Sequence, residues 1–265
     1  MNTISVQRDG YLVEVRLQRP EKLNAQTHEM WFELRQVGAE LGQDTSIRAL
    51  VVSGEGRSFS AGLDTAVLSG GSAGSAAPDL EGLSGPPFVR KIQESFTWLA
   101  DAPYPTIAAV QGHAFGAGCQ LALACDLRIA ADDAVFGLLE TNWGLMPDLG
   151  GTAWLPPLVG PAKAKELMWL ADKIDAAEAL SLQLVNRVVP RADLAVEVDA
   201  LARRVAARPP LAVSGIKKAV NASMVDSEAG LDAAAEGQIV CLGSDDLREA
   251  GTAWLEQRDP NYSGT

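Results

Sequence analysis

The sequence predicts an α/β fold with a largely parallel sheet, followed by an all-helical C-terminal region. In the first half of the chain, short apolar strands alternate with segments of helical periodicity, the order typical of parallel strands covered by helices. From about Pro161 onward the pattern is helical, apart from one strand at residues 186–190. We therefore divide the chain into an α/β core, residues 1–195, and a helical region, residues 196–265, which packs on the core or on a neighbouring subunit.

Periodicity predicts the elements of the first half in order. Residues 3–20 alternate apolar and polar side chains around Asp9-Gly10, which indicates a two-stranded hairpin. Residues 28–41 have apolar positions at helical spacing, and residues 47–54 form a short apolar strand of the kind that is covered on both faces. The remaining elements are a helix near residues 88–100, a strand at 106–110, a helix opening after Gly116 and a strand at 126–130.

The connecting and C-terminal segments have signals of their own. Residues 69–87 are rich in Gly, Ser and Pro and have little to bury, which predicts a mobile surface loop. Asp175 and Ser244 each precede a helical run and are predicted N-caps. The helices expected after Pro161 cover residues 162–173, 175–183, 191–207, 209–223 and 244–258.

Composition limits the function classes. Hydrophobic residues make up 47% of the 265 residues, enough for a substantial core. The net charge of −12 argues against a nucleic-acid-binding or anionic-membrane surface. No apolar run reaches the ~18 residues that a membrane span requires, and the first ten residues lack the basic flank and apolar stretch of a signal peptide. We expect a cytoplasmic protein.

The cysteines and histidines leave little material for disulfides or metals. Cys119, Cys125 and Cys241 match no disulfide or zinc spacing, so they are interpreted as buried thiols in a reducing compartment. With only His28 and His113 present, no metal site is expected. The chain also lacks a G-x-S-x-G elbow, a Walker A lysine and a G-x-G-x-x-G after its first strand. A Ser/His/Asp triad that uses His113 stays open, although no spacing favours it.

Two glycine-containing turns follow predicted strands. The first is Ala61-Gly62-Leu63-Asp64, and the second is Gly116-Ala117-Gly118 before an apolar helix. Glycine allows close approach to the backbone, and a helix start presents unpaired N–H groups. Because the carboxyl ends of parallel strands open onto a shared crevice, the two turns could each offer an N–H to one anionic oxygen. Each turn is also consistent with a tight strand-to-helix connection.

Two carboxylates interrupt the apolar segment that follows. Glu140 and Asp148 stand among the apolar residues of the segment from 134 to 155. An apolar environment disfavours the charged form and raises the pKa of a carboxyl group toward values useful for proton transfer. The alternative is that Glu140 lies in a surface turn and that Asp148 caps the helix after Gly151. The apolar neighbours expected to surround the two carboxylates are Phe136, Leu138, Leu139, Trp143, Leu145 and Met146.

Five blocks of the chain together resemble the enoyl-CoA hydratase/isomerase family, also called the crotonase superfamily. The resemblance runs nearly from end to end, and the blocks occur in the order expected for the family. Five blocks in sequence are specific for the family, but much less so for the reaction. They are RPEKLNA (19–25), GRSFSAGLD (56–64), AVQGHAFGAGCQLALACDLRIA (109–130), FGLLETNWGLMPDLGGT (136–152) and SDDLREAGTAWLEQRDPNY (244–262).

The resemblance implies a crotonase-like spiral of ββα units and a helical C-terminal region that forms trimers, often paired into hexamers. It also implies an acyl-coenzyme A thioester as the substrate, with no further cofactor. By position, the two family N–H groups that bind the thioester oxygen fall on Leu63 and Ala117. This agrees with the interpretation of the two turns, because fixed donors there would stabilise an enolate-like transition state.

The resemblance further assigns substrate-binding residues. The first block and the turn after it would line the coenzyme A tail, with Lys22 and Arg57 near its phosphates. The substrate-binding residues expected on this basis are Lys22, Leu23, Ala25, Ala61, Leu63, Asp64, Gly116, Ala117 and Gln120.

The chain departs from a typical hydratase of the family at one of two glutamates. The second glutamate falls on Glu140, but Gln120 stands where the first is expected. An amide neither gives nor takes a proton near neutral pH, and loss of a general acid or base costs roughly 10²–10⁴-fold in rate. Asp148 lies at a position where family members that shift double bonds often have a carboxylate. Dienoyl-type isomerases, however, also carry an aspartate where Gln120 stands, so this match is partial.

Three hypotheses follow. The first is an isomerase that shifts the double bond of an enoyl-CoA, with Glu140, Asp148 or both as proton carriers. The second is a 2-enoyl-CoA hydratase in which Glu140 acts with a water placed by Gln120. The third, of another class, is a non-catalytic acyl-CoA-binding protein that has kept the fold.

Overall fold

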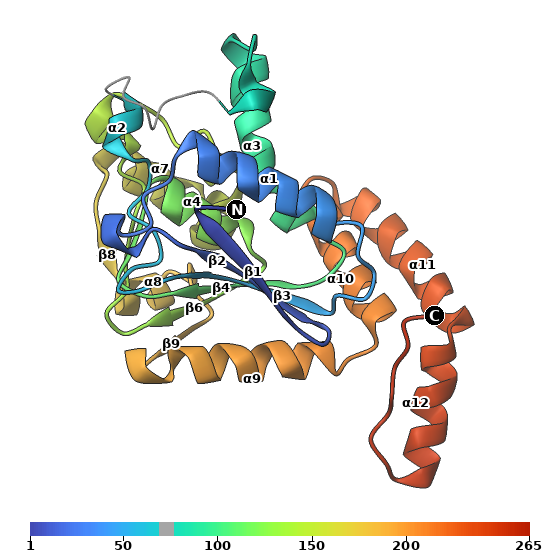
Figure 1. Cartoon of the computed structure of the whole chain (residues 1–265). Coiled ribbons are helices and arrows are strands. Elements are labelled where there is room, and N and C mark those ends of the chain that lie inside the picture. The colour runs from blue at the N-terminus through green and yellow to red at the C-terminus, as the bar shows by residue number, and fades with distance from the viewer. Residues whose placement is uncertain (69–76) are drawn as a thin grey trace.

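A six-stranded sheet forms the centre of the molecule (Figure 1). The computed structural model describes residues 1–68 and 77–265. The strand order is β1-β2-β3-β4-β6-β9, in which β1 pairs antiparallel with β2 and all other neighbours are parallel. This confirms the predicted hairpin and the largely parallel core. The strands are Ile4–Asp9 (β1), Leu12–Leu17 (β2), Ala49–Gly54 (β3), Thr106–Val110 (β4), Leu127–Ala131 (β6) and Arg187–Val189 (β9).

Alternate residues of the central strands face two separate cores. Leu50, Val52 and Ala108 belong to one cluster, which helices α1 (His28–Leu41), α3 (Gly85–Asp101) and α4 (Ala117–Ala124) complete. Ile107 and Ala109 belong to the other cluster, together with Leu194, Val198 and Ala202 of α9 (Leu194–Ala206). Because side chains alternate along a strand, a strand that is apolar on both faces lies between helices on both sides.

A second sheet escaped prediction. It has three strands in the order β5-β7-β8, with β5 (His113–Phe115) parallel to β7 (Val135–Gly137), and β7 antiparallel to β8 (Ile174–Asp175). Strands of two or three residues are too short to show a period of two. This sheet is nevertheless important for the site, since it holds β5 just before the glycine-rich turn.

The helices of the C-terminal region agree with prediction except at one point. Asp175 accepts a hydrogen bond from the Glu178 N–H, and Ser244 accepts one from the Leu247 N–H, so both predicted caps are confirmed. Helix α11 (Ser227–Gly243) was not predicted, because its apolar residues form no single stripe at helical spacing. The other helices are α2 (Thr65–Leu68), α5 (Gly151–Trp154), α6 (Pro156–Val159), α7 (Pro161–Leu170), α8 (Ala176–Ser181), α10 (Pro210–Ser223) and α12 (Asp245–Glu256).

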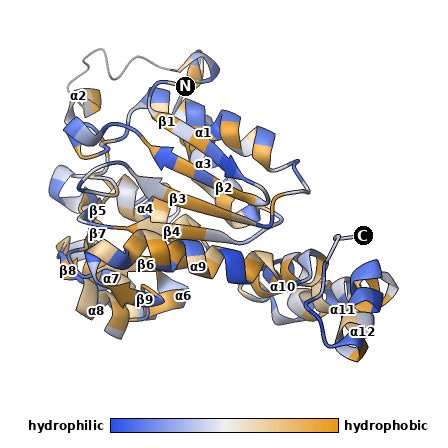
Figure 2. Cartoon of the chain, turned by 60° about the horizontal axis from the view of Figure 1, so that its bottom comes forward, coloured by the Kyte–Doolittle hydropathy of each residue, from blue (hydrophilic) through white to orange (hydrophobic). Residues whose placement is uncertain are grey.

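Helices α10, α11 and α12 form an arm that extends away from the sheets (Figures 1 and 2). Lys217 of α10 anchors the arm to the core, since its ammonium group lies 2.8 Å from the Asp126 carboxylate and also donates to the Leu99 and Tyr104 carbonyls. The predicted division between residues 195 and 196 falls within α9, which packs on the sheet. The division of the chain into two regions stays a prediction.

The predicted loop at residues 69–87 is only partly within the described structure, because residues 69–76 lie outside the described residues. Within the described part, Ala77 and Leu80 are buried in the core and Gly85 begins α3. The expectation that this stretch has little to bury was therefore wrong for those residues. Among the helices of residues 1–68 and 77–265, none is long and apolar enough to span a membrane.

The three cysteines are free thiols. Cys119 and Cys125 are buried, as predicted, whereas Cys241 on the arm is only half-buried. Burial raises the pKa of both buried thiols to about 12, so they stay protonated at neutral pH. The reducing compartment inferred from them stays a prediction.

Candidate active site

The two glycine-containing turns lie side by side. The segment before the first turn pairs with β5: the Ser60 N–H donates to the His113 carbonyl over 2.8 Å, and the Phe115 N–H donates to the Ser60 carbonyl over 3.0 Å. Ser60 and Ala114 accordingly form a parallel bridge. Residues more than 50 positions apart in sequence are thereby held next to each other, with Leu63 after one segment and Ala117 after the other.

Glycine is required in both turns by close packing. Gly62 has a φ of +90°, and a Cβ placed on it would lie 2.6 Å from the Phe115 carbonyl oxygen and 3.6 Å from the Ala117 nitrogen. A Cβ on Gly118 would overlap the carbonyl oxygen of Ser60. A side chain at either position would therefore push the turns apart. These glycines serve the contact between the turns as well as the local bends.

The N–H groups of Leu63 and Ala117 are available to a ligand. Among the described residues, neither group donates a hydrogen bond, whereas the neighbouring N–H groups of Ala61, Asp64 and Gly116 all do. Ala117 is also the first residue of α4, where the helix dipole favours negative charge. Two free donors at adjoining turns are suited to bind one partly negative oxygen.

A hydrogen-bonded framework, which sequence reasoning missed, holds the first turn. Arg19 forms an ion pair with Asp64 over 2.9 Å and also donates to the Ala25 carbonyl. Burial on its own would raise the pKa of Asp64, but the Ala66 N–H and Arg19 outweigh it and lower the pKa. Asn24 is fully buried with a φ of +55°, and its side chain binds the backbone at Arg19 and at the loop that holds Glu55 and Ser58. Polar contacts of this kind have no signal in hydrophobic periodicity.

The segment from 19 to 25, which holds several predicted binding residues, is hydrogen-bonded to the turn at 61–64. The Ala61 N–H donates to the Leu23 carbonyl over 2.8 Å, and the Gln26 N–H donates to the Gly62 carbonyl over 2.7 Å. Lys22 is exposed beside this pairing. The structure thus brings the segment from 19 to 25 against the turn at 61–64, as a shared binding surface requires.

Glu140 faces the glycine-rich turn. It begins a short 3₁₀-helix, Glu140–Trp143, and its Oε1 would lie 3.4 Å from a Cβ built on Gly116. Its Oε2 is buried without a hydrogen-bond partner among the described residues. Burial raises the pKa of Glu140, and the nearby Asp148 raises it further, although hydrogen bonds from its own backbone N–H and from Gln120 oppose this. The interpretation of Glu140 as a surface-turn residue is therefore wrong.

Gln120 uses both ends of its side-chain amide. The oxygen accepts hydrogen bonds from the N–H groups of Leu149 and Gly151, over 2.8 and 2.9 Å. The nitrogen donates to Glu140 Oε1 over 2.6 Å. Gln120 itself is buried in α4, one turn after Ala117.

Asp148 lies near Glu140 and does not cap a helix. Helix α5 has Gly150 at its N-cap position and no side-chain cap, so the alternative role for Asp148 is excluded. Burial raises its pKa. Asp148 is held through its backbone, since its carbonyl accepts from the Gln93 side chain over 2.5 Å.

The apolar surroundings of the carboxylates differ from the expectation. Phe136 and Leu138 are buried, but Trp143, Leu145 and Met146 are exposed. Glu140 is instead desolvated by the glycine-rich turn and by Gln120 of α4. Side-chain direction in an irregular segment depends on the tertiary fold, which the sequence alone does not reveal.

His113 does not form a catalytic triad. Its Nδ1 lies 2.9 Å from Ser58 Oγ, but Ser58 is 1% exposed. A nucleophile must reach its substrate. Among the described residues, no carboxylate is hydrogen-bonded to His113, so the pair has a structural role.

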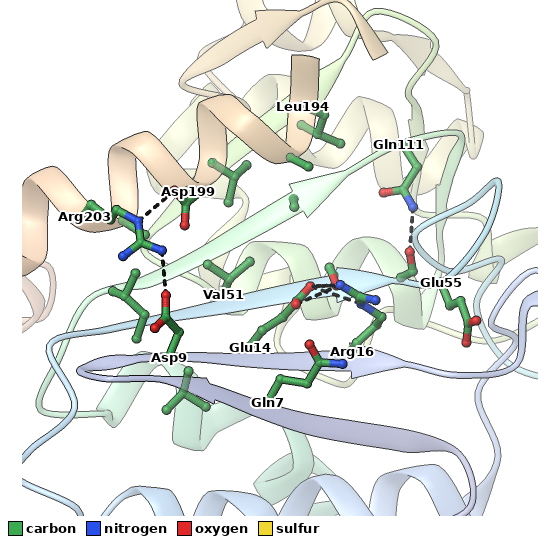
Figure 3. Close-up of a pocket in the computed structure, with 18 of the residues that line it drawn as sticks. Gln7, Asp9, Glu14, Arg16, Val51, Glu55, Gln111, Leu194, Asp199 and Arg203 are labelled. Carbon is green, nitrogen blue, oxygen red and sulfur yellow. Dashed lines mark hydrogen bonds and ion pairs between the residues drawn. The ribbon is translucent and has the colours of Figure 1, made fainter. Parts of the chain in front are cut away.

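A cavity of about 510 Å³ lies away from both turns, between the six-stranded sheet and α9 (Figure 3). Several of its charged groups pair with one another: Arg16 lies 2.8 Å from Glu14, and Arg203 bridges Asp9 and Asp199. None of the predicted catalytic or binding residues lines it. We therefore place the chemistry at the turns and not in this cavity.

The chain is similar over its whole length to acyl-CoA enzymes. The family model described as enoyl-CoA hydratase/isomerase matches residues 7–265. A crotonyl-CoA hydratase of Syntrophomonas wolfei is 35% identical, with 98% of this chain and 97% of that protein covered. A peroxisomal Δ(3,5)-Δ(2,4)-dienoyl-CoA isomerase of Arabidopsis thaliana is 33% identical, with 96% and 94% covered.

A solved structure from Thermobifida fusca YX, in complex with acetoacetyl-CoA, superposes on this chain with a TM-score of 0.83. The two chains are 37% identical, and the match covers 91% of this chain and 95% of that one. The similarity therefore extends through both sheets and into the C-terminal helices.

Proposed function

Because the chain belongs to the enoyl-CoA hydratase/isomerase family, we propose that it shifts the double bond of an enoyl-CoA by moving a proton. That it is an enzyme acting on acyl-CoA substrates follows from the family. That the reaction is an isomerisation is our proposal. It rests above all on Glu140, whose Oε2 is buried beside the turn at Ala117; within the described residues, neither this oxygen nor the Ala117 N–H has a hydrogen-bond partner.

In the proposed mechanism, the thioester oxygen accepts hydrogen bonds from the N–H groups of Leu63 and Ala117. Glu140 removes a proton from C2 of a 3-enoyl-CoA, and the electron pair left on C2 is delocalised onto the thioester oxygen as a dienolate. A carboxylic acid then protonates C4, and the double bond comes to rest between C2 and C3. Each backbone N–H that binds the thioester oxygen is expected to stabilise the transition state by about 3–4 kcal/mol, as in comparable sites.

Asp148 supplies a second carboxyl group for the return of the proton. Burial raises the pKa values of both Glu140 and Asp148, so that either could hold the proton between the two steps. A raised pKa makes each carboxylate a stronger base, and the acid that results can give the proton back. The two groups thus fit a transfer between carbons better than the addition of water.

The coenzyme A tail would lie along the first block. The segment from 19 to 25 and the turn at 61–64 are hydrogen-bonded to each other next to the free Leu63 N–H. Lys22 is exposed there and can meet a phosphate. Coenzyme A enters in this scheme as part of the substrate.

Hydration is the second candidate, and the hydratase similarities favour it. Glu140 would activate water in that case, with Gln120 as the polar group beside it. The amide oxygen of Gln120 already accepts two backbone N–H groups, so only its second N–H could bind the water. One carboxylate would then perform both proton transfers.

A turnover experiment separates the two reactions. The wild-type enzyme is expected to convert a 3-enoyl-CoA to the conjugated 2-enoyl-CoA, with a gain of conjugated-thioester absorbance. Glu140→Gln should slow this by roughly 10²–10⁴-fold, and Asp148→Asn should also slow it if Asp148 returns the proton. Rapid loss of conjugation from crotonyl-CoA, without isomerisation of 3-enoyl-CoA, would favour hydration instead.

A further inference from the structure

The orientation of the Gln120 amide is fixed by its surroundings. Its Oε1 has two partners, the N–H groups of Leu149 and Gly151, and both can only donate. The oxygen end must therefore point toward them, and the NH₂ end must point toward Glu140. Gln120 is 1% exposed, so water does not compete for these bonds.

The fixed amide distinguishes the two oxygens of Glu140. Nε2 of Gln120 donates to Oε1 over 2.6 Å, a short bond of the kind that a charged acceptor makes. Oε2 is buried and has no partner among the described residues. An unpaired buried carboxylate oxygen is costly, which indicates that the site reserves it for a group that the substrate brings.

We propose that Gln120 is a positioning residue: it holds Oε1 of Glu140, assigns proton transfer to Oε2, and ties Glu140 to the segment that bears Asp148. This inference rests on the proposed role of Glu140 and explains why an amide, rather than a second carboxylate, stands at position 120. A carboxylate there could still accept from Leu149 and Gly151, but it could donate to Glu140 only when protonated.

The charged and polar groups around Glu140 determine whether its pKa should rise or fall when Gln120 is replaced. Among the described residues, the titratable groups that interact with it are Asp148, on the segment before α5, and Cys119, on α4. The Cys119 thiol, with a pKa of about 12, stays neutral. Hydrogen bonds from the backbone N–H of Glu140 itself and from Gln120 favour the ionised form of Glu140 and oppose burial and Asp148. Loss of the Gln120 donor should therefore raise the pKa of Glu140 further.

The test is the titration of the Glu140 carboxyl group in the full-length protein. It is followed by infrared difference spectra, in which each variant is compared with the same variant carrying Glu140→Gln. Gln120→Met keeps the length of the side chain and removes the amide, and we expect it to raise the pKa of Glu140 by about one unit. In 3-enoyl-CoA isomerisation, kcat should fall by roughly 10–100-fold while KM changes by less than about threefold.

Two further variants guard against a purely structural explanation. Gln111→Met removes another buried amide, which donates to the Gly54 carbonyl over 2.7 Å, and it should lower stability while leaving the titration of Glu140 unchanged. If Gln120→Met fails to fold, Gln120→Glu takes its place, because a carboxylate can still accept hydrogen bonds from the N–H groups of Leu149 and Gly151. It should make the two carboxyl groups share one proton, and so raise one pKa.

The outcomes separate this inference from the proposed reaction. An unchanged Glu140 titration in both Gln120 variants, or an equal shift in Gln111→Met, would overturn the positioning role. The titration requires no turnover. A wild-type enzyme that does not isomerise 3-enoyl-CoA would therefore count against the proposed function alone.

Discussion

At the scale of single residues, the site depends on one carboxylate that is poorly solvated. Glu140 is half-buried, its Oε2 has no partner in the described part of the chain, and burial raises its pKa. A raised pKa means that the folded state binds the proton more tightly than the unfolded chain. The folded protein therefore loses stability when Glu140 ionises, which is the cost of keeping a reactive base.

This cost predicts a pH-dependent gain in stability for Glu140→Gln. Below the ordinary pKa of 4.5, Glu140 is protonated in both the folded and the unfolded state, so the variant and the wild type should unfold at similar temperatures. As pH rises through the raised pKa of the folded state, the wild type should unfold at a lower temperature than the variant. Calorimetry at pH 8 and at a pH below 4.5 would check this; a gap that is the same at both values would contradict it.

At the scale of elements, the two N–H donors are aligned by the packing of one turn on the other. Gly62 contacts the Phe115 carbonyl, and Gly118 contacts Ser60, without space for a Cβ. Helix α4 is buried along all of its eight residues. Its N-terminus therefore cannot shift without disturbing the core, and this rigidity is what a preorganised oxyanion site requires.

Gly118→Ala should separate the two turns. The added methyl group overlaps backbone and side-chain atoms of Ser60, so we expect a loss of about 1–3 kcal/mol in the free energy of unfolding. A fall in kcat should accompany it as the Leu63 and Ala117 N–H groups lose alignment.

Gly251→Ala is the matched control, because nothing lies within 4 Å of its added Cβ and it stands in helix α12. It should stabilise the protein by up to about 1 kcal/mol and leave kcat unchanged. Urea unfolding and steady-state kinetics of the two variants provide the measurements. Wild-type kcat in Gly118→Ala would show that alignment does not depend on this contact.

At the scale of the whole molecule, the arm exposes apolar side chains that a soluble monomer would bury. Ile216 is 65% exposed, Leu231 72% and Trp254 79%. Large apolar side chains that are exposed in number on one region favour an interaction site there. Since the chain carries a net charge of −12, association has to be driven by apolar contact more than by charge. We propose that the arm forms the interface of a trimer or a hexamer.

Sedimentation should give a mass three or six times that of one chain. Trp254→Asp introduces a charge into the proposed interface and should shift the mass toward the monomer. Val196→Asp serves as the control, because Val196 is 70% exposed but lies on α9 rather than on the arm. A wild-type protein that sediments as a monomer, or equal dissociation by both variants, would refute the assignment of the interface.

Much of the fold was predictable because its long elements are strongly patterned. The hairpin at β1 and β2, helix α1 and strand β4 all follow from apolar spacing. The small sheet β5-β7-β8 and helix α11 could not be predicted, since the strands are shorter than a readable period and α11 lacks an apolar stripe. Both turns and Glu140 were singled out from residue type and position, and the resemblance to the family then assigned them roles.

The sequence by itself determined the family, the two glycine turns and the carboxylates, because each is a local signal of residue type and spacing. Only the tertiary structure decided how they meet. It placed Ser60 against β5, left the N–H groups of Leu63 and Ala117 without partners in the described chain, and joined Gln120 to Glu140. These contacts link segments that are distant in sequence, and no local pattern encodes the direction of a side-chain amide or the burial of one carboxylate oxygen.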